Sequence, residues 1–235
     1  MTSALITGAN KGLGFETARR LHTAGYTVFL GARDPGRGAD AAAKLGAKFV
    51  MLDVTDDASI EAALNTVDAA GGLDVLVNNA GIEPRLPDGG FVDPAEVTAD
   101  DVRKVFDTNV FGMVGVLHTF LPLLQRSTNP VVVNVSSGLS NTAALADPAG
   151  PAYFYPDLAY PASKAAVNMI TVQYAKAFSG IRINAVDPGF TATDLNHNTG
   201  TQTVEQGAEV IVRMAQIGPD GPTGTFQSAA GPLSW

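Results

Sequence analysis

The chain has 235 residues, a formal net charge of −8, 46% hydrophobic and 16% charged residues, and no cysteine. This composition predicts one folded α/β domain, and the negative charge disfavours a nucleic-acid or anionic-membrane partner. The lack of cysteine excludes disulfides and thiolate catalysis, and no run reaches the ~18 apolar residues of a membrane span. We therefore expect a cytoplasmic protein without a signal peptide.

A Gly-rich turn follows the first predicted strand, residues 3–7. The sequence Thr7-Gly8-Ala9-Asn10-Lys11-Gly12-Leu13-Gly14 leads into a helical pattern that ends before Gly25, and a second strand covers residues 26–30. This order is typical of a dinucleotide site, because glycines let the backbone approach a pyrophosphate and the helix N-terminus supplies N–H donors. The spacing Gly-x-x-x-Gly-x-Gly departs from the commoner Gly-x-Gly-x-x-Gly.

The end of the second strand indicates which dinucleotide binds. An NAD site usually has an acidic residue here, hydrogen-bonded to the ribose 2′-hydroxyl. This strand ends instead in Arg33, and Lys11 lies in the Gly-rich turn. A guanidinium matches a 2′-phosphate with bidentate hydrogen bonds, so we predict NADP(H) rather than NAD(H). Alternatively, both cations are solvated surface charges, with Asp34 offsetting Arg33.

Strands and helices alternate along the rest of the chain. Further strands are predicted over residues 48–52, 73–77, 130–137, 181–186 and 225–226, and helices over 35–45, 55–67, 98–126, 160–178 and 204–216. We expect residues 98–126 to form two helices with Asn109 near their junction, and residues 82–97 to form an irregular surface loop. Alternation of this kind predicts a Rossmann-type α/β fold, with a doubly wound, mainly parallel seven-stranded sheet and helices on both faces. We expect one catalytic domain over residues 1–235. Asp53, at the end of the third strand, would accept a hydrogen bond from an adenine amino group.

Tyr160 and Lys164 lie four residues apart at the start of a predicted helix. On a helix, this spacing places both side chains on one face. A lysine cation favours the phenolate and moves the pKa of the tyrosine towards neutrality, so the pair is a candidate general acid/base. None of the other four tyrosines has a lysine four residues later. The alternative is a surface pair without a role.

The full ordered set of motifs resembles the short-chain dehydrogenase/reductase family in its single-domain form. The motifs are Thr7-Gly8…Gly12-Leu13-Gly14, Asn78-Asn79-Ala80-Gly81, Asn109, Ser137, Tyr160…Lys164 and Pro188-Gly189…Thr193. The resemblance covers nearly the whole chain. It implies an NADP(H)-dependent oxidoreductase that reduces a ketone or aldehyde to an alcohol, or catalyses the reverse reaction.

The resemblance also implies a role for each motif residue. Tyr160 would be the acid or base, Lys164 would lower its pKa and bind the nicotinamide ribose, Ser137 would polarise the carbonyl, and Asn109 would hold a proton-relay water. The implied cofactor-binding residues are Gly8, Asn10, Lys11, Gly12, Leu13, Gly14, Arg33, Asp53, Val54, Asn79, Ala80, Gly81, Tyr160, Lys164, Pro188, Gly189, Thr191 and Thr193. The expected substrate contacts are Ser137, Leu139, Tyr160 and Phe190. No metal site is expected.

Two details of the fifth predicted strand and of the segment after it refine this interpretation. Ser136 and Ser137 point to opposite faces of a strand, and the family pattern selects Ser137 for the catalytic role. Tyr160 follows Ser137 by 23 residues, more than is usual in the family. The extra residues resemble, in shorter form, the insertion of the monomeric carbonyl reductases, so we expect a monomer rather than a dimer or tetramer. Its aromatic residues, Tyr153, Phe154 and Tyr155, either line a substrate pocket or anchor the segment.

Two other functions share parts of this pattern. Sugar-nucleotide epimerases and dehydratases have the same tyrosine and lysine but usually carry a sizeable C-terminal domain, whereas 46 residues follow Gly189 here. Non-catalytic NADP(H) sensors typically lose the tyrosine or the lysine, and both are present. The expected partner is a small carbonyl or alcohol substrate, whose identity and preferred reaction direction the sequence leaves open.

Overall fold

Short runs rich in valine, isoleucine and leucine form the strands of a central sheet in the computed structural model, which describes residues 2–235. The strands are β1 (Ser3–Ile6), β2 (Thr27–Ala32), β3 (Lys48–Met51), β4 (Val75–Asn78), β5 (Val131–Val135), β6 (Arg182–Val186), β7 (Phe226–Ser228) and β8 (Gly231–Leu233). Their order is β3-β2-β1-β4-β5-β6-β7-β8, and only β8 is antiparallel to its neighbour. The predicted doubly wound, mainly parallel sheet is therefore confirmed.

The eighth strand is the difference from the seven that the sequence predicts. β8 has three residues and pairs Phe226 with Leu233 and Ser228 with Gly231. Trp235 then stacks on Phe226, with ring centroids 5.7 Å apart. A strand this short carries no periodic pattern, so only its pairing with β7 identifies it. Trp235 covers the buried end of β7.

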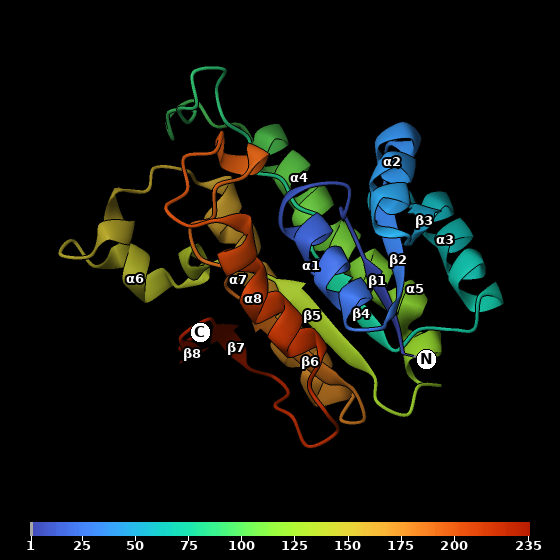
Figure 1. Cartoon of the computed structure of the whole chain (residues 1–235). Coiled ribbons are helices and arrows are strands. Elements are labelled where there is room, and N and C mark those ends of the chain that lie inside the picture. The colour runs from blue at the N-terminus through green and yellow to red at the C-terminus, as the bar shows by residue number, and fades with distance from the viewer. Residues whose placement is uncertain (1) are drawn as a thin grey trace.

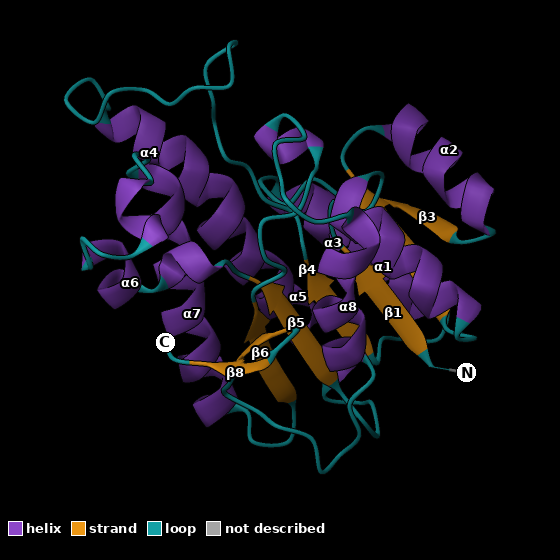
Figure 2. Ribbon diagram, turned by 60° about the vertical axis from the view of Figure 1, so that its left-hand side comes forward, coloured by secondary structure: helices purple, strands orange, loops and turns teal. Residues whose placement is uncertain are grey.

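Helices cover both faces of the sheet (Figures 1 and 2). They are α1 (Gly12–Thr23), α2 (Pro35–Leu45), α3 (Asp57–Ala69), α4 (Ala99–Phe106), α5 (Met113–Leu124), α6 (Thr142–Ala146), α7 (Ala159–Ala177) and α8 (Val204–Ala215). α1 packs on α8, and α3 packs on α5. A π-helical stretch, Asp107–Gly112, joins α4 to α5 at the predicted junction.

Two hydrophobic cores lie on opposite sides of the sheet. Ile6 and Val77 belong to the core shared with α1 and α8, whereas their strand neighbours Leu5 and Leu76 belong to the core shared with α3 and α5. Successive strand residues point to opposite faces, and a parallel sheet is buried on both. The two cores hold the sheet in place, and its carboxyl edge carries the polar motifs.

Buried amides fix the central strands at that edge. Asn78 of β4 donates to Asn134 of β5 at 2.9 Å, and Asn134 donates to Thr171 of α7 at 2.9 Å. Buried polar groups need such partners, because an unpaired amide costs free energy. These bonds set the register of β4 and β5 and attach α7 to them.

Two irregular segments extend from this edge. Residues 82–97 follow β4, and residues 138–158 follow β5 and contain α6 with short 3₁₀ turns at Gly138–Ser140 and Pro151–Phe154. Both views show α6 standing away from the sheet (Figures 1 and 2). The irregular loop predicted over 82–97 is confirmed, and the longer segment has more local structure than its composition suggests.

Candidate functional site

The Gly-rich turn depends on three glycines for its shape. Gly8 and Gly12 have φ values of +62° and +55°, a region that other residues adopt at a cost. A Cβ on Gly14 would lie 2.5 Å from the Asn79 side-chain nitrogen and 2.7 Å from the Gly8 carbonyl oxygen. Asn79 donates to the carbonyl oxygens of Thr7 and Gly8 at 2.9 and 3.2 Å. The turn is thus held by backbone contacts that leave no space for larger side chains.

The N-terminus of α1 opens directly from this turn. Its N-cap residue, Lys11, makes no side-chain capping hydrogen bond. The first N–H groups of a helix have no partner within the helix and carry a partial positive charge. They are therefore suited to bind an anionic phosphate.

Cations lie around this turn and the end of β2. Arg33 is exposed and forms no hydrogen bond or ion pair within residues 2–235. Lys11 pairs with Asp194 at 2.8 Å, and this bond holds the pKa of Asp194 below its usual value, with a smaller contribution from Arg37. Asp34 caps α2 by accepting from the Arg37 backbone N–H at 2.9 Å. Arg37, which the sequence interpretation missed, is recognisable as a second arginine four residues after Arg33.

The turn after β3 is fixed by the side chain of Asp53. Its Oδ1 accepts from the Thr55 N–H at 3.0 Å and from the Thr55 hydroxyl at 2.8 Å. Val54 is buried next to it. Asp53 lies where the adenine end of a dinucleotide would be expected, with one carboxylate oxygen already bound.

The two threonines after β6 have different environments. Thr191 is buried, its hydroxyl donates to the Pro188 and Gly189 carbonyls at 3.2 Å each, and it accepts from Gln202 at 2.8 Å. The Thr193 methyl lies 3.6 Å from the position that a Cβ on Gly12 would occupy. Of the two, Thr193 faces the Gly-rich turn, whereas Thr191 stabilises its own loop.

Tyr160 and Lys164 share one face of α7, which begins at Ala159. Asp157 accepts from the Ala159 N–H at 3.1 Å and from the Tyr160 N–H at 3.2 Å, and so caps the helix at the catalytic candidate. Both side chains are buried, with the Lys164 Nζ 5.5 Å from the Tyr160 ring centroid. Nζ donates to the Val135 carbonyl at 2.8 Å, which holds the ammonium at the end of β5.

Burial controls the protonation of this pair. The pKa of Tyr160 is raised, first by burial and then by the negative charge of Glu83, while a hydrogen bond with Ser137 lowers it. Burial lowers the pKa of Lys164 to about 8. The expected lowering of the tyrosine pKa by Lys164 is not found in the polypeptide, because loss of hydration penalises the phenolate more. Glu83 is a second residue that the sequence interpretation missed.

The two serines after β5 point in different directions. Ser136 is buried, and its hydroxyl donates to the Lys164 carbonyl at 3.3 Å. Ser137 accepts from the Leu139 N–H at 3.2 Å, and its hydroxyl is near enough to the phenol to lower the pKa of Tyr160. Ser137 is therefore the serine beside the phenol, with Leu139 next to it in the 3₁₀ turn. Phe190, the other expected substrate contact, is half exposed in the loop after β6.

Asn109 lies in the π-helical stretch and uses its whole amide. Its Oδ1 accepts from the Ile82 N–H at 2.8 Å, and its Nδ2 donates to the Ile82 carbonyl at 2.9 Å and to Ser163 at 3.0 Å. A Cβ on Gly81 would lie 3.3 Å from the Asn109 Oδ1 and 3.6 Å from the Lys164 Nζ. Asn109 thus ties the chain after β4 to α7 beside Lys164. A π-helical turn often marks a functional site.

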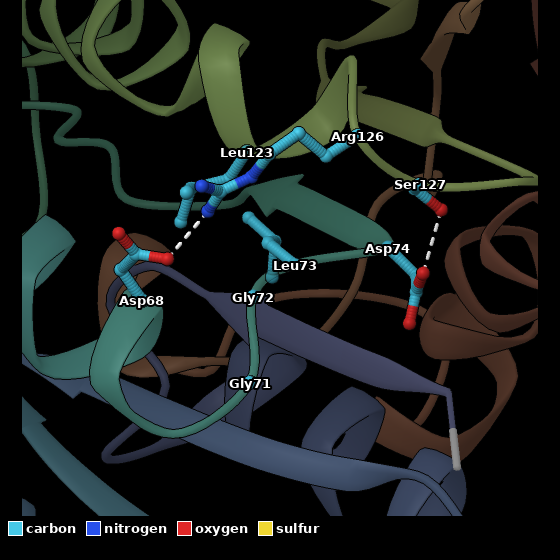
Figure 3. Close-up of a pocket in the computed structure, with 8 residues that line it drawn as sticks. All are labelled: Asp68, Gly71, Gly72, Leu73, Asp74, Leu123, Arg126 and Ser127. Atoms are coloured by element: carbon cyan, nitrogen blue, oxygen red, sulfur yellow. Dashed lines mark hydrogen bonds and ion pairs between the residues drawn. The ribbon is translucent and has the colours of Figure 1, made fainter.

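A hollow of about 350 Å³ lies at the opposite, amino edge of the sheet (Figure 3). Asp68 is paired there with Arg126, and Ser127 donates to Asp74 at 2.6 Å. All four side chains have partners, and none belongs to the motifs above. Within residues 2–235, no three His, Asp or Glu side chains are grouped to hold a metal ion, and no helix is long and apolar enough to cross a membrane.

Comparisons with known proteins agree with this arrangement. A family model described as short chain dehydrogenase matches residues 2–204. The (+)-neomenthol dehydrogenase of Capsicum annuum is 30% identical and aligns over 95% of this chain and 94% of its own length. The salutaridine reductase of Papaver bracteatum is 31% identical, over 96% and 94%.

A solved structure extends the comparison to three dimensions. The NADPH-bound carbonyl reductase from chicken fatty liver is 28% identical and superposes with a TM-score of 0.85, over 100% of this chain and 99% of that one. The alignment with the Capsicum annuum protein spans 298 positions, more than the 235 residues here, so that protein contains segments that this chain lacks. The chain belongs to the short-chain dehydrogenase/reductase family of oxidoreductases.

Proposed function

We propose that this protein is an NADP(H)-dependent oxidoreductase that reduces a ketone or aldehyde to an alcohol, or catalyses the reverse, with Tyr160 as the acid/base. The observation that carries the proposal is the meeting of Tyr160, Lys164, Ser137 and Asn109 at the carboxyl edge of β4 and β5. Ligands of open α/β sheets bind at this edge. The compared proteins, a dehydrogenase and two reductases, support the same class of reaction.

The residues of this chain are suited to bind each charged part of NADP(H). Gly8, Gly12 and Gly14 with the N-terminus of α1 would hold its pyrophosphate. Arg33, exposed and unpaired within residues 2–235, would bind the 2′-phosphate, with Arg37 and Lys11 as further cations. When bound, the nicotinamide supplies or accepts the hydride.

The protein groups manage the proton. The raised pKa of Tyr160 keeps its phenol protonated at neutral pH, the state of an acid that donates to a carbonyl oxygen. Ser137, which lies beside the phenol, would bind the same oxygen. The buried Lys164 ammonium would stabilise the phenolate left after transfer, and the Val135 carbonyl and the Asn109–Ser163 bond keep that part of α7 in place.

The first test is Tyr160→Phe. Turnover with a ketone or aldehyde should fall by about 10²- to 10⁴-fold, because the variant lacks the proton donor. The dissociation constant for NADPH should change less than about twofold. Tyr174→Phe is the matched control, since it removes a hydroxyl from the same helix where the ring stacks on Phe178. Full turnover by Tyr160→Phe with every active carbonyl substrate would show the mechanism to be wrong.

A further inference from the structure

A buried charged cluster lies beside the catalytic candidates and is not explained by them. Glu83 follows β4, and its side chain is 5% exposed, while that of Arg85 is 9% exposed. The Arg85 Nε and Nη2 both lie 2.9 Å from the Glu83 Oε2. The Tyr155 hydroxyl donates to the other carboxylate oxygen, Oε1. Buried charges are costly unless paired, so all three residues depend on one another.

Aromatic rings complete this contact. The Phe91 ring lies under the Arg85 guanidinium, 4.4 Å from its carbon, and meets the Tyr155 ring edge-on at 5.1 Å. We call the four residues Glu83, Arg85, Phe91 and Tyr155 the latch. It joins residues 82–92, after β4, to residues 141–158, which include α6. Tyr153 and Phe154 pack on each other instead and are largely exposed.

The latch is connected to the site along both chains. On one side, Ile82 precedes Glu83 and is bound by Asn109 through its N–H and its carbonyl. On the other side, Tyr155 is two residues before Asp157, which caps α7 at Tyr160. A movement of Tyr155 away from Glu83 would therefore shift the cap of the helix that carries the phenol.

The Glu83 charge also acts on the site directly. The carboxylates that face Tyr160 are Glu83 from the chain after β4, Asp187 from the chain after β6 and Asp157 from the turn before α7, with Lys164 as the nearest cation. After burial, Glu83 contributes most to the raised pKa of Tyr160. It also opposes the fall in the pKa of Lys164.

We propose that Glu83 is a positioning residue for this reaction, which through Tyr155 holds residues 141–158 closed beside Tyr160 as the wall of the substrate site. The inference rests on the proposed function for its kinetic consequences. The closed contact itself is independent of that function. Substrate binding should then depend on the latch, whereas cofactor binding should not.

Tyr155→Phe is the main variant, because it removes one hydrogen bond and leaves the buried ion pair intact. Tyr174→Phe is the matched control, with the same change on α7, outside both the latch and residues 141–158. We expect Tyr155→Phe to raise the KM for a carbonyl substrate at least about fivefold and to speed amide hydrogen exchange over residues 144–155 at least about tenfold. The dissociation constant for NADPH should stay within about twofold, and Tyr174→Phe should match the wild type throughout.

Glu83→Gln tests the charge, since glutamine keeps an acceptor for Tyr155. Removal of the Glu83 charge should lower the pKa of Tyr160. In a plot of kcat/KM against pH, the limb that reports Tyr160 should therefore move to lower pH by about half a unit or more, in either reaction direction. A residue that only stabilised the fold would not move this limb. Thermal unfolding of both variants measures any loss of stability separately.

Two results would overturn the inference: Tyr155→Phe equal to Tyr174→Phe in KM and exchange, or an unmoved pH limb in Glu83→Gln. A wild-type protein that turns over no carbonyl or alcohol would instead refute the proposed function. The exchange measurement would still decide whether the latch exists, so the two failures are distinguishable.

Discussion

The proposed cofactor side and the proposed substrate side of the site are built in different ways. The proposed cofactor side is built mainly on one stretch of sequence, from Gly8 to Arg37, and relies on backbone shape and a helix N-terminus. Asn79 and Thr193 reach this stretch from later segments. The substrate side joins segments 72 residues apart, Glu83 and Tyr155, through side chains alone.

This difference predicts unequal tolerance to substitution. Backbone contacts of the Gly-rich turn cannot relax, because each atom is fixed by the strand before it and the helix after it. The substrate side can lose individual contacts and still keep the sheet beneath it. Three experiments test this comparison.

The largest effect is expected from Gly14→Ala. Its new Cβ would lie 2.5 Å from the Asn79 nitrogen and 2.9 Å from the Ala9 Cα, so the turn must deform. We expect the dissociation constant for NADPH to rise at least about 100-fold, equivalent to about 3 kcal/mol, in a fluorescence titration.

Gly150→Ala is the control on the substrate side, where the nearest atom is 3.4 Å away. It should change NADPH affinity less than about twofold and leave the thermal transition within about 2 °C. Equal effects of the two substitutions would remove the distinction between the two sides.

Arg33→Ala should act on cofactor choice alone. Loss of a charge-assisted hydrogen bond should weaken NADPH binding about 10- to 30-fold, while NADH binding stays the same. Lys44→Ala, which removes an equal charge from the last turn of α2, is the control. If wild-type protein binds NADPH and NADH equally, the assignment of Arg33 is wrong.

Lys164→Met should show that the buried ammonium of Lys164, which lies between the two sides, destabilises the folded protein. Burial lowers the pKa of Lys164 to about 8, below its usual 10.5, so folding is penalised while the lysine is charged. The variant should lose activity yet unfold with a free energy about 1 kcal/mol higher at pH 7, part of the gain being offset by the lost bond to Val135.

The stability advantage of Lys164→Met should depend on pH. Between pH 8 and 10.5 the unfolded wild type binds more protons than the folded form, so its stability rises with pH. The advantage of Lys164→Met should therefore shrink across this window in denaturant titrations. If the difference in unfolding free energy between the variant and the wild type stays constant or grows with pH, burial does not lower the pKa of Lys164.

Much of the fold followed from local pattern. Alternating strands and helices predicted the parallel sheet, and the apolar strands are buried on both faces as expected. β8 was missed because three residues hold no periodicity, and the π-helical turn at Asn109 appeared only as a junction. Among the cations near the end of β2, Arg37 was missed although it lies four residues after Arg33.

The sequence alone determined the family, the sheet and the place of the Gly-rich turn and of the Tyr160–Lys164 pair. These features depend on residues a few positions apart, whose geometry the backbone dictates. Tertiary structure decided that Ser137 meets Tyr160, that Thr191 turns inward and that Glu83 lies beside the phenol. Burial and long-range charge control these features, and both arise only when distant segments pack together.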